Sequence, residues 1–459
     1  MRTGRGSLLR LYALAGACCA VAACVTIGKS TSTPTPVTVS GAKGTVTQAS
    51  GDATVARTVA DAPDPQAIER LEALMETVSD EPLFKDNEVR LLVDGPETYA
   101  AMLAAIGAAK VNVHLETYIF NEDVVGDRFA DALLARSAAG VEVRVIYDSL
   151  GSRESSPEFF DRMRKGGIHL VEFHPVNPAT GGNPLNANVR DHRKLLVVDG
   201  ETAFTGGVNL DKNYSSSSVL HRRPKKAAPG WRDTHIQIRG PAVAGFQRLF
   251  LSNWKEGDGP PPEDESKLFP KPVARGKNLV RVLSSLGGEG NVSPIRMAYG
   301  YAMEAASERI WLTQSYFGPD ADFLKTMTTA AERGVDVRII VTGFTDSPTL
   351  LNISRSCYEQ LLRAGVKIYE SSDVMLHAKT AVIDGVWSTV GSSNLDYRSF
   401  IHNNEVNAVV VGEDFGTSME TMFRKDMALS TPIILEQWEK RPLFDRTKEK
   451  FSRLFQYWL

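Results

Sequence analysis

Two stretches of this 459-residue chain carry the same chemically active residue types at the same spacing. Each reads His-x-Lys-x4-Asp, and each is followed by a turn of small residues and then by an asparagine. One such pattern is a weak signal, whereas two copies with matching continuations are a strong one. The two sets are His192, Lys194, Asp199 and Asn209, and His377, Lys379, Asp384 and Asn394.

These residue types favour a reaction at a phosphate group. An ammonium group holds an anion, and an imidazole either attacks phosphorus or passes a proton to a leaving oxygen. Two copies brought face to face would supply two histidines, two lysines and two side-chain amides to one site. For a single copy, a half-buried structural histidine on a strand is an equally good explanation, but it does not account for both copies and their flanks.

The local pattern predicts how each set is positioned. The histidine and lysine lie in an alternating, apolar-rich run typical of a strand, where positions i and i+2 share a face. Each aspartate is followed by glycine, a pair typical of hairpin turns, so we expect Asp199 and Asp384 to orient the strands rather than to act as acid or base. The second hairpin strands would end at Gly206-Gly207 and at Gly391, where the backbone can approach a ligand closely.

Strand and helix patterns alternate along the chain from residue 89 onward. The first half is predicted to hold strands at 89–93, 111–120, 141–147 and 168–173, and helices at 97–108, 126–138 and 157–165. Similar segments recur at 279–283, 310–316, 334–339 and 362–367. A repeat of this length indicates duplication of a whole domain. We therefore expect an α/β fold of two mixed or parallel sheets flanked by helices, related by a pseudo-twofold axis, with one active site at the seam.

The motif flanks narrow the interpretation further. They include Trp-Arg-Asp-Thr-His at 231–235, Gly-Pro-Ala-Val at 240–243, and Asp-Tyr-Arg-Ser at 396–399 followed by Asn403 and Glu405. The paired motifs resemble those of the phospholipase D superfamily, and the flanks resemble its bacterial cardiolipin synthase branch. The similarity covers about residues 88–459.

The resemblance implies roles for further residues. In this superfamily a carboxylate binds the far nitrogen of the catalytic histidine, and Asp233 and Glu405 occupy the matching places after the two motifs. Asn209 and Asn394 would help to hold and orient the phosphate. No metal and no cofactor is expected, because paired lysines can neutralise the charge that a metal would otherwise neutralise.

The implied reaction is phosphatidyl transfer through a phosphohistidine intermediate. By analogy His192 is the nucleophile and His377 the acid and base, although the pseudo-symmetry leaves their order open. The first expectation is cardiolipin synthesis from phosphatidylglycerol. The alternatives are a hydrolytic phospholipase D that releases phosphatidic acid, a nuclease of the same superfamily, and a non-enzymatic lipid-binding protein at the membrane.

The N-terminus has the features of a bacterial lipoprotein leader. A positively charged start precedes an apolar run at 11–23, which is too short to span a bilayer. Val-Ala-Ala-Cys at 21–24 resembles a lipobox and would make Cys24 a lipidated residue; the alternatives are a poorer match ending at Cys18 and an uncleaved signal anchor. We therefore expect the protein in the bacterial cell envelope, anchored to a membrane through Cys24 and facing the periplasm or the exterior.

Composition and charge are those of an ordinary globular protein, with 42% hydrophobic and 23% charged residues, which excludes wholesale disorder. The net charge of −3 argues against a general nucleic-acid binder. The expected partners are a phospholipid substrate, phosphatidylglycerol first, and a membrane surface. Because both motifs lie in one chain, a monomer would suffice. Outside the leader only Cys357 remains, so neither an intrachain disulfide nor a cysteine metal site is expected.

The predicted domain organisation has six parts. They are a lipoprotein-type signal peptide at 1–24, a flexible Ser/Thr/Pro/Ala tether at 25–66, a first half at 67–256, a linker at 257–277, a second half at 278–430 and an amphipathic tail at 431–459. A short amphipathic helix is predicted at 65–78. The basic loop at 215–229 is either a solvated loop or a contact to anionic headgroups. The tail is either a core-packed helix or an interfacial helix with an aromatic rim.

Overall fold

The computed structural model describes residues 36–79, 81–176, 188–216, 230–288, 290–345 and 347–457. The predicted leader with Cys24 and most of the basic loop at 215–229 lie outside the described residues, so the predictions made for them stay predictions. No helix in the described part of the chain is long and apolar enough to cross a membrane.

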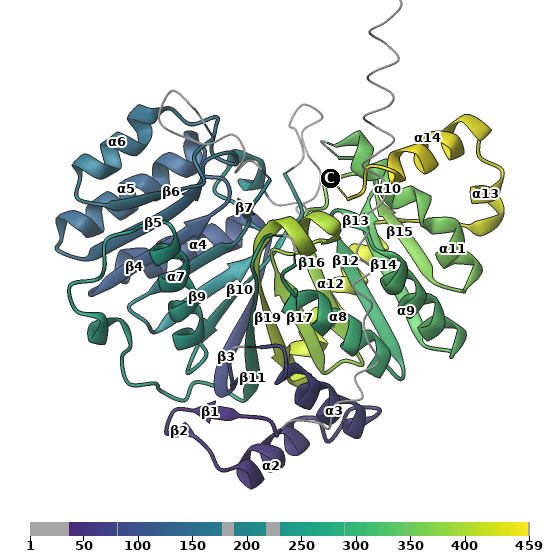
Figure 1. The fold of residues 1–459 in the computed structure, drawn as a ribbon, viewed down its shortest axis with the longest axis horizontal. Coiled ribbons are helices and arrows are strands. Elements are labelled where there is room, and N and C mark those ends of the chain that lie inside the picture. Colours follow the sequence, from purple (N-terminus) through teal and green to yellow (C-terminus); the bar gives the residue numbers. More distant parts are fainter. Residues whose placement is uncertain are drawn as a thin grey trace, which may run out of the picture. The chain divides into compact units, whose positions relative to one another are not determined.

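The first half is built on a mixed sheet in the strand order β6-β5-β4-β8-β9-β10-β3 (Figure 1). Strands β4, β5 and β6 run parallel to one another, and the remaining neighbours pair antiparallel. The strands are β3 Leu83–Val93, β4 Asn112–Thr117, β5 Glu142–Asp148, β6 His169–Phe173, β8 Lys194–Val198, β9 Thr202–Gly206 and β10 Thr234–Arg239.

Helices cover both faces of this sheet. They are α4 Asp94–Ala108, α5 Val124–Ala138, α6 Pro157–Lys165 and α7 Val243–Glu256. Successive side chains of β8 point to opposite faces of the sheet, so the strand contributes to a hydrophobic core on each face. Leu196 and Val198 join the core beneath α4, α5 and α6. Leu195 and Val197 join the core beneath α7. Burial on both faces explains why β8 is apolar throughout after Lys194.

The second half repeats the first strand for strand, in the order β15-β14-β12-β16-β17-β19-β11. Its strands are β11 Asn278–Ser285, β12 Arg309–Gln314, β14 Asp336–Thr342, β15 Lys367–Ser371, β16 Lys379–Ile383, β17 Trp387–Gly391 and β19 Asn403–Val411. Its helices are α8 Pro294–Ala305, α9 Ala321–Glu332, α10 Pro348–Ser356, α11 Tyr358–Arg363 and α12 Glu413–Ala428. The predicted duplicated α/β fold is therefore confirmed.

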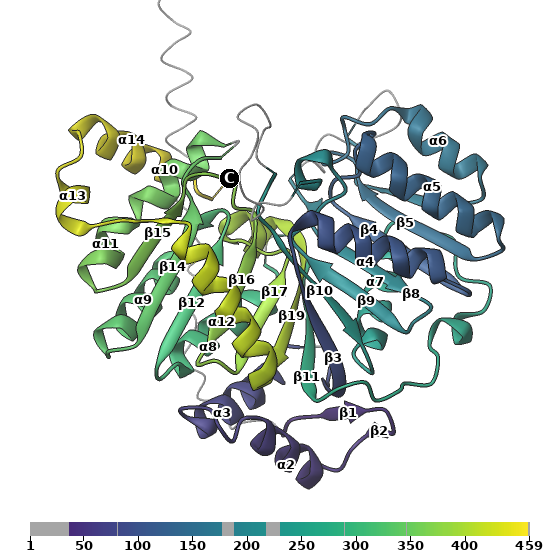
Figure 2. The same ribbon diagram turned by 180° about the vertical axis from the view of Figure 1, so that it is seen from behind.

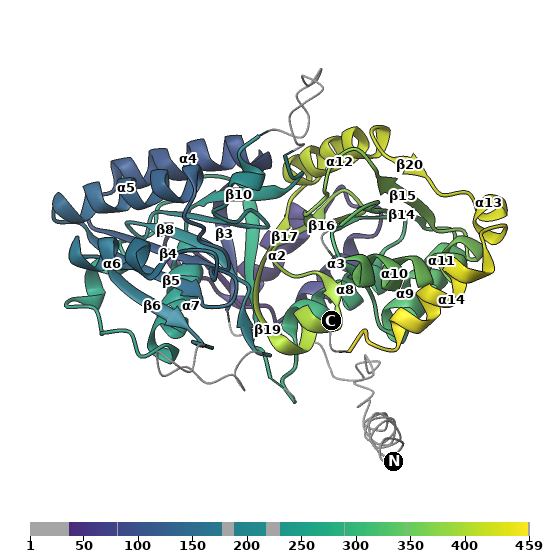
Figure 3. The ribbon, with the colours of Figure 1, turned by 90° about the horizontal axis from the view of Figure 1, so that it is seen from above.

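The two sheets meet edge to edge through β3 and β11, which pair antiparallel with Phe84 opposite Val280 (Figures 1 and 2). They therefore form one continuous sheet rather than two separate sheets. Figure 3 shows α4 and α5 of the first half on the same side as α12 of the second half, as a twofold relationship between the halves requires. Near the seam, the two-residue strand β7 Arg190–Asp191 pairs in parallel with the start of β19.

The prediction of a flexible tether at 25–66 is wrong from residue 36 onward. This segment forms β1 Val39–Gly41, β2 Gly44–Thr45 and α2 Gln48–Thr58, and the predicted next helix is present as α3 Pro65–Met75. Strand β1 pairs with β3, so the segment extends the sheet. The Ser- and Thr-rich composition concealed a few well-spaced apolar residues that are buried, namely Val37, Val39, Val55 and Val59.

The linker and the tail complete the described chain. The linker contains one short 3-10 helix, η4 Glu265–Leu268, and joins the last helix of the first half to β11. The tail forms β20 Thr431–Pro432, α13 Leu435–Glu439 and α14 Leu443–Arg453. Its last helix carries several of the exposed large apolar side chains of the protein, so the core-packed alternative is not what the structure shows.

Candidate active site

The two motif histidines lie at the seam, each immediately before a strand of its own half. His192 precedes β8 and His377 precedes β16. The backbone N–H of His192 donates to the carbonyl of Asn404 at 2.9 Å, and that of His377 donates to the carbonyl of Arg232 at 2.7 Å. Each histidine is thus held in place by the backbone of the opposite half.

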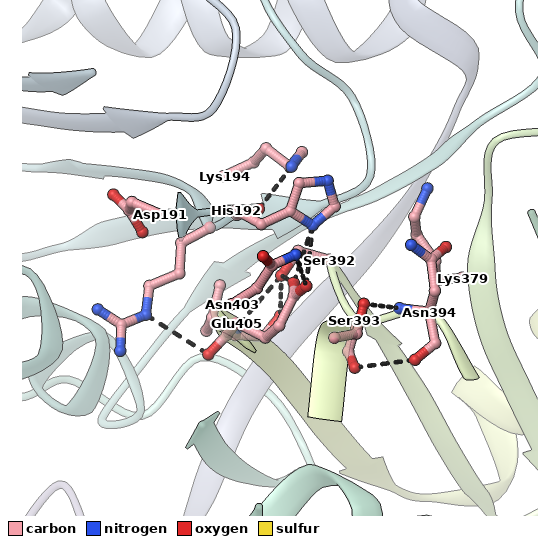
Figure 4. Close-up of polar contacts among 12 residues, drawn as sticks. Asp191, His192, Lys194, Lys379, Ser392, Ser393, Asn394, Asn403 and Glu405 are labelled. Carbon is pink, nitrogen blue, oxygen red and sulfur yellow. Dashed lines mark hydrogen bonds and ion pairs between the residues drawn. The ribbon is translucent and has the colours of Figure 1, made fainter. Parts of the chain in front are cut away.

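Each histidine side chain also bonds to a carboxylate of the opposite half. His192 Nδ1 lies 3.0 Å from both carboxylate oxygens of Glu405 (Figure 4). His377 Nδ1 lies 2.7 Å from Oδ2 of Asp233. An ionised carboxylate only accepts hydrogen bonds, so Nδ1 carries the proton in both rings and Nε2 is the nitrogen available for attack. The structure brings together the four residues that the sequence analysis singled out.

Burial keeps the histidines neutral at rest, whereas interactions with their neighbours keep the two carboxylates charged. Burial acts to raise the pKa of Glu405, but the charges of His192 and Lys194 and the hydrogen bonds it accepts outweigh burial and lower that pKa to about 2. The pKa of Asp233 is also lowered, because His377 outweighs its burial. Burial lowers the pKa of His192 and of His377 to about 4, assisted by the neighbouring lysines. Neutral imidazole is the form that a nucleophile or a general base needs.

The lysines reach the same site from β8 and β16 (Figure 4). Lys194 Nζ donates to the carbonyl of His192 and lies 5.2 Å from the centre of the Tyr118 ring. Lys379 Nζ donates to the carbonyl of His377. Burial lowers the pKa of Lys194 to about 7, and the charge of Lys379 acts in the same direction. Each ammonium group disfavours the charge of the other, so an anion bound near both would be stabilised.

The two histidines share a cavity of about 210 Å3. Both histidines and both predicted asparagines line it. Asn394 Oδ1 is buried without a hydrogen-bond partner among the described residues, so this side chain is free to bind a substrate. Asn209 donates to the Tyr214 hydroxyl at 3.0 Å, and the same hydroxyl lies 3.1 Å from His377 Nδ1, so Asn209 also supports the histidine.

Asp199 and Asp384 lie outside this site, as expected for turn residues. They follow strands β8 and β16, roughly 17 Å from the histidine end of each five-residue strand. Asp199 accepts backbone N–H groups of residues 110–112, and Asp384 accepts those of residues 307–309. Both have positive φ, 53° and 51°, a conformation that aspartate tolerates better than most residues. The two aspartates tie each hairpin to the strand beside it and do not touch the reacting groups.

The glycine turns serve a different purpose from the predicted one. A Cβ added at Gly207 would lie 2.1 Å from Oδ1 of Asp233, and one added at Gly391 would lie 2.1 Å from Oδ1 of Asn407. The absent side chains therefore make room for polar side chains of the protein's own supporting network, not for a ligand.

Several site residues were not identified as such from the sequence. The cavity lining includes Tyr118, Trp231, Asp396 and Arg398. Burial raises the pKa of Asp396 to about 7, so at neutral pH this carboxyl can donate as well as accept. Ser392 donates its hydroxyl to Glu405 at 2.5 Å, which helps to fix that carboxylate. Single aromatic or polar residues in strand ends carry no local signal, which explains why they were missed.

Among the described residues, no group of three or more His, Cys, Asp or Glu side chains is arranged to hold a metal ion. The prediction that the reaction needs no metal and no cofactor stays a prediction.

The duplicated fold and the paired motifs define a protein of the phospholipase D superfamily. The family model described as cardiolipin synthase, PLD-like domain, matches residues 102–219 and 301–427. Cardiolipin synthases of Alkalihalophilus pseudofirmus and Listeria monocytogenes are each 34% identical to this chain over 81% of it, covering 72% and 75% of their own lengths. The chain belongs to this cardiolipin synthase branch.

The solved structures support the fold. The crystal structure of phosphatidylserine synthase from Haemophilus influenzae Rd KW20 matches with a TM-score of 0.58 and 14% identity, covering 81% of this chain and 95% of that chain. At this identity the match shows a shared fold.

Proposed function

We propose that this protein transfers a phosphatidyl group between two alcohols through a phosphohistidine intermediate. In the first step Nε2 of His192 attacks the lipid phosphorus and the bond from phosphorus to the headgroup oxygen breaks. His377 enters this step as an imidazolium, protonated on Nε2 and stabilised by Asp233 and the bound phosphate, and gives that oxygen the Nε2 proton. In the second step His377 takes the proton of a second alcohol, whose oxygen displaces His192 from phosphorus. Lys194 and Lys379 neutralise the charge on the phosphoryl oxygens throughout.

The observation that carries this proposal is the pair of crossed His–carboxylate contacts, Glu405 to His192 and Asp233 to His377. A proton fixed on Nδ1 leaves Nε2 unprotonated and ready to attack, and the carboxylate stabilises the imidazolium that forms later. Asn394 lines the cavity, and its Nδ2 amide would donate a hydrogen bond to a phosphoryl oxygen.

The donor and acceptor follow from the family. The curated relatives are cardiolipin synthases, so we assign phosphatidylglycerol to both roles, with free glycerol leaving in the first step and cardiolipin formed in the second. The same chemistry with water as acceptor would be a phospholipase D and would give phosphatidic acid.

The test uses purified protein, vesicles of phosphatidylglycerol and mass spectrometry of the lipids. Cardiolipin and glycerol in equal amounts, absent with His192→Asn and with His377→Asn, are expected. Phosphatidic acid as the sole product would replace the transferase by a hydrolase. An active His377→Asn protein would contradict the mechanism.

The order of the two histidines needs a separate measurement. Rapid quenching during turnover, followed by peptide mass spectrometry under alkaline conditions, should find the phosphatidyl group on the peptide that contains His192. Finding it on the peptide that contains His377 would reverse the two roles and leave the rest of the proposal intact.

Because the relatives of this chain are cardiolipin synthases, we expect the protein to work at a membrane. We further propose that Cys24 carries a lipid anchor, that the body faces the periplasm or exterior of a bacterial cell, and that one chain is sufficient for activity. Cys24→Ser should release the protein from the membrane fraction or leave its leader uncleaved, and labelling with a fatty-acid analogue should be lost.

A further inference from the structure

Helix α14 is oriented with its apolar side chains toward solvent and its polar side chains toward the protein. The buried residues of the helix are Glu449 and Ser452. The large apolar side chains of the helix and the two residues after it are exposed by 76%, 77%, 61%, 74% and 43% at Leu443, Phe444, Phe451, Leu454 and Phe455. A surface helix held by the hydrophobic effect alone has the opposite arrangement. This apolar face is therefore available for a partner.

Specific polar contacts hold the helix in this orientation. Glu449 forms an ion pair with Arg441, whose guanidinium stacks on the Trp438 ring. Arg446 reaches Glu359 of α11 at 3.4 Å. Turning the helix to bury its phenylalanines would break both ion pairs and would place Glu449 in solvent. The exposed apolar face is thus stabilised by the fold.

The charges on the same face indicate what the partner is. Lys448 lies one turn after Phe444, and Lys450 is also exposed, with Asp445 as the exposed acidic residue of the helix. Lysine stems lie along an apolar surface while the ammonium groups stay at its polar edge. A layer of anionic headgroups above hydrocarbon matches this combination. A second copy of the protein is a poorer partner for this face, because the lysines of the two copies would repel each other.

Two connections link α14 to the elements that line the active-site cavity. Helix α14 packs against α10, and Leu350 of α10 lines the active-site cavity (Figures 1 and 3). The carbonyl of Tyr457, just after the helix, accepts a hydrogen bond from Nε2 of His402 at 3.1 Å. His402 ends the short helix η5 Arg398–His402, and Arg398 also lines the cavity.

We infer that the α14 face, formed by Leu443, Phe444, Lys448, Phe451, Leu454 and Phe455, docks on an anionic phospholipid bilayer and brings the cavity mouth to the lipid surface. The inference rests on the proposed function in that the substrate is a bilayer lipid. It goes beyond that function by assigning the protein surface that contacts the bilayer.

The direct test is photo-crosslinking with the full chain in phosphatidylglycerol vesicles. The vesicles contain a phospholipid with a photoreactive group near the start of one acyl chain, and labelled peptides are identified by mass spectrometry. We expect labelling within residues 443–455. Labelling should persist in His192→Asn, which separates docking from catalysis. Crosslinks confined to other surfaces would overturn the inference whether or not the protein makes cardiolipin.

Kinetics provide a second test with a matched control. The variant Phe444→Ser/Phe451→Ser/Leu454→Ser should lose about tenfold in kcat/KM on vesicles, because apolar burial at the membrane is removed while other membrane attachment remains. Its activity on a short-chain, water-soluble phosphatidylglycerol should be unchanged. The control Val124→Ser/Val273→Ser/Val292→Ser removes three apolar side chains elsewhere on the surface, which are exposed by 63%, 52% and 61%.

Three outcomes would contradict the docking surface. They are an equal loss in the control variant, an equal loss on the water-soluble substrate, and a dimer in solution that the α14 variant abolishes. The last outcome would assign the face to a second copy of the chain. Failure of the wild-type protein to process either substrate would count against the proposed function instead, and the crosslinking result would still decide the docking.

Discussion

Glu405 accepts a hydrogen bond from Nδ1 of His192 at 3.0 Å although the two residues are 213 positions apart and belong to opposite halves of the chain. The second pair, Asp233 with His377, crosses the seam in the other direction. Neither half therefore holds a complete His–carboxylate pair, and the two halves must associate before either histidine is oriented.

These His–carboxylate hydrogen bonds between the halves predict that an amide side chain cannot replace either carboxylate without loss of activity. Glu405→Gln should lower kcat by about 100-fold or more, because glutamine does not stabilise an imidazolium and can present its NH2 group to Nδ1. Ser392→Ala, which removes one hydrogen bond to the same carboxylate, should cost about tenfold. Steady-state kinetics with melting temperatures would check both. A Glu405→Gln protein with more than a tenth of wild-type activity would refute the orienting role.

The lowered pKa of Lys194 predicts how anion binding depends on pH. Lysine must be protonated to hold a phosphoryl group, and its pKa of about 7 in the free protein means that the charged fraction falls as the pH rises above 7. We expect inorganic phosphate, used as a competitive inhibitor, to bind about tenfold more weakly at pH 8.5 than at pH 6.5. Calorimetry at pH 7 in two buffers should detect proton uptake on binding. Phosphate affinity that does not vary between pH 6.5 and pH 8.5 would contradict the lowered pKa of Lys194 as the basis of anion binding.

The two histidines predict a loss of stability in mild acid. Their pKa is about 4 in the folded protein and 6.5 in the unfolded chain, so between these values the unfolded chain binds more protons. Stability therefore falls as the pH drops from 6.5 to 4, by up to about 3 kcal/mol for each histidine. Urea unfolding at pH 7 and at pH 5 would measure the change. In the variant His192→Asn/His377→Asn the free energy of unfolding should depend clearly less on pH. An unchanged pH dependence would show that the two histidines are not its cause.

The N-terminal segment should be essential to the fold and not a spacer. Arg281 of β11 and Glu72 of α3 form a fully buried ion pair at 3.1 Å. Arg281→Met alone leaves a buried carboxylate without its partner and should cost about 3 to 5 kcal/mol. The double variant Arg281→Met/Glu72→Leu should recover most of that loss. Equal stability of all three proteins in chemical denaturation would show that the segment contributes little.

The hairpin aspartates should affect stability and not chemistry. Asp384 accepts the backbone N–H groups of residues 307, 308 and 309 at 2.8 to 2.9 Å, and it does not line the active-site cavity. Asp384→Ala should lower the free energy of unfolding by about 2 to 4 kcal/mol. At a temperature where the variant stays folded, its kcat should lie within about threefold of the wild-type value, in contrast to His377→Asn. A selective loss of kcat in a stable variant would show instead that Asp384 takes part in the reaction.

Local patterns were sufficient for much of the fold and the site. The strand runs around His192 and His377, the Asp-Gly turns and the alternation of strands with helices all depend on residues close together in sequence, so they could be predicted. The segment at 36–64 could not, because four spaced valines in a Ser- and Thr-rich stretch give no clear period. Its order comes from pairing with β3, a strand that follows later in the chain.

The sequence by itself determined the residue types of the site, their duplication and hence the phosphate chemistry. Only the tertiary structure decided which carboxylate serves which histidine, that Gly207 makes room for Asp233, and that the apolar residues of α14 face outward. The physical reason is the same in each case. These relationships arise from the way two sheets approach at β3 and β11 and from ion pairs between distant helices, and no spacing along the chain encodes such contacts.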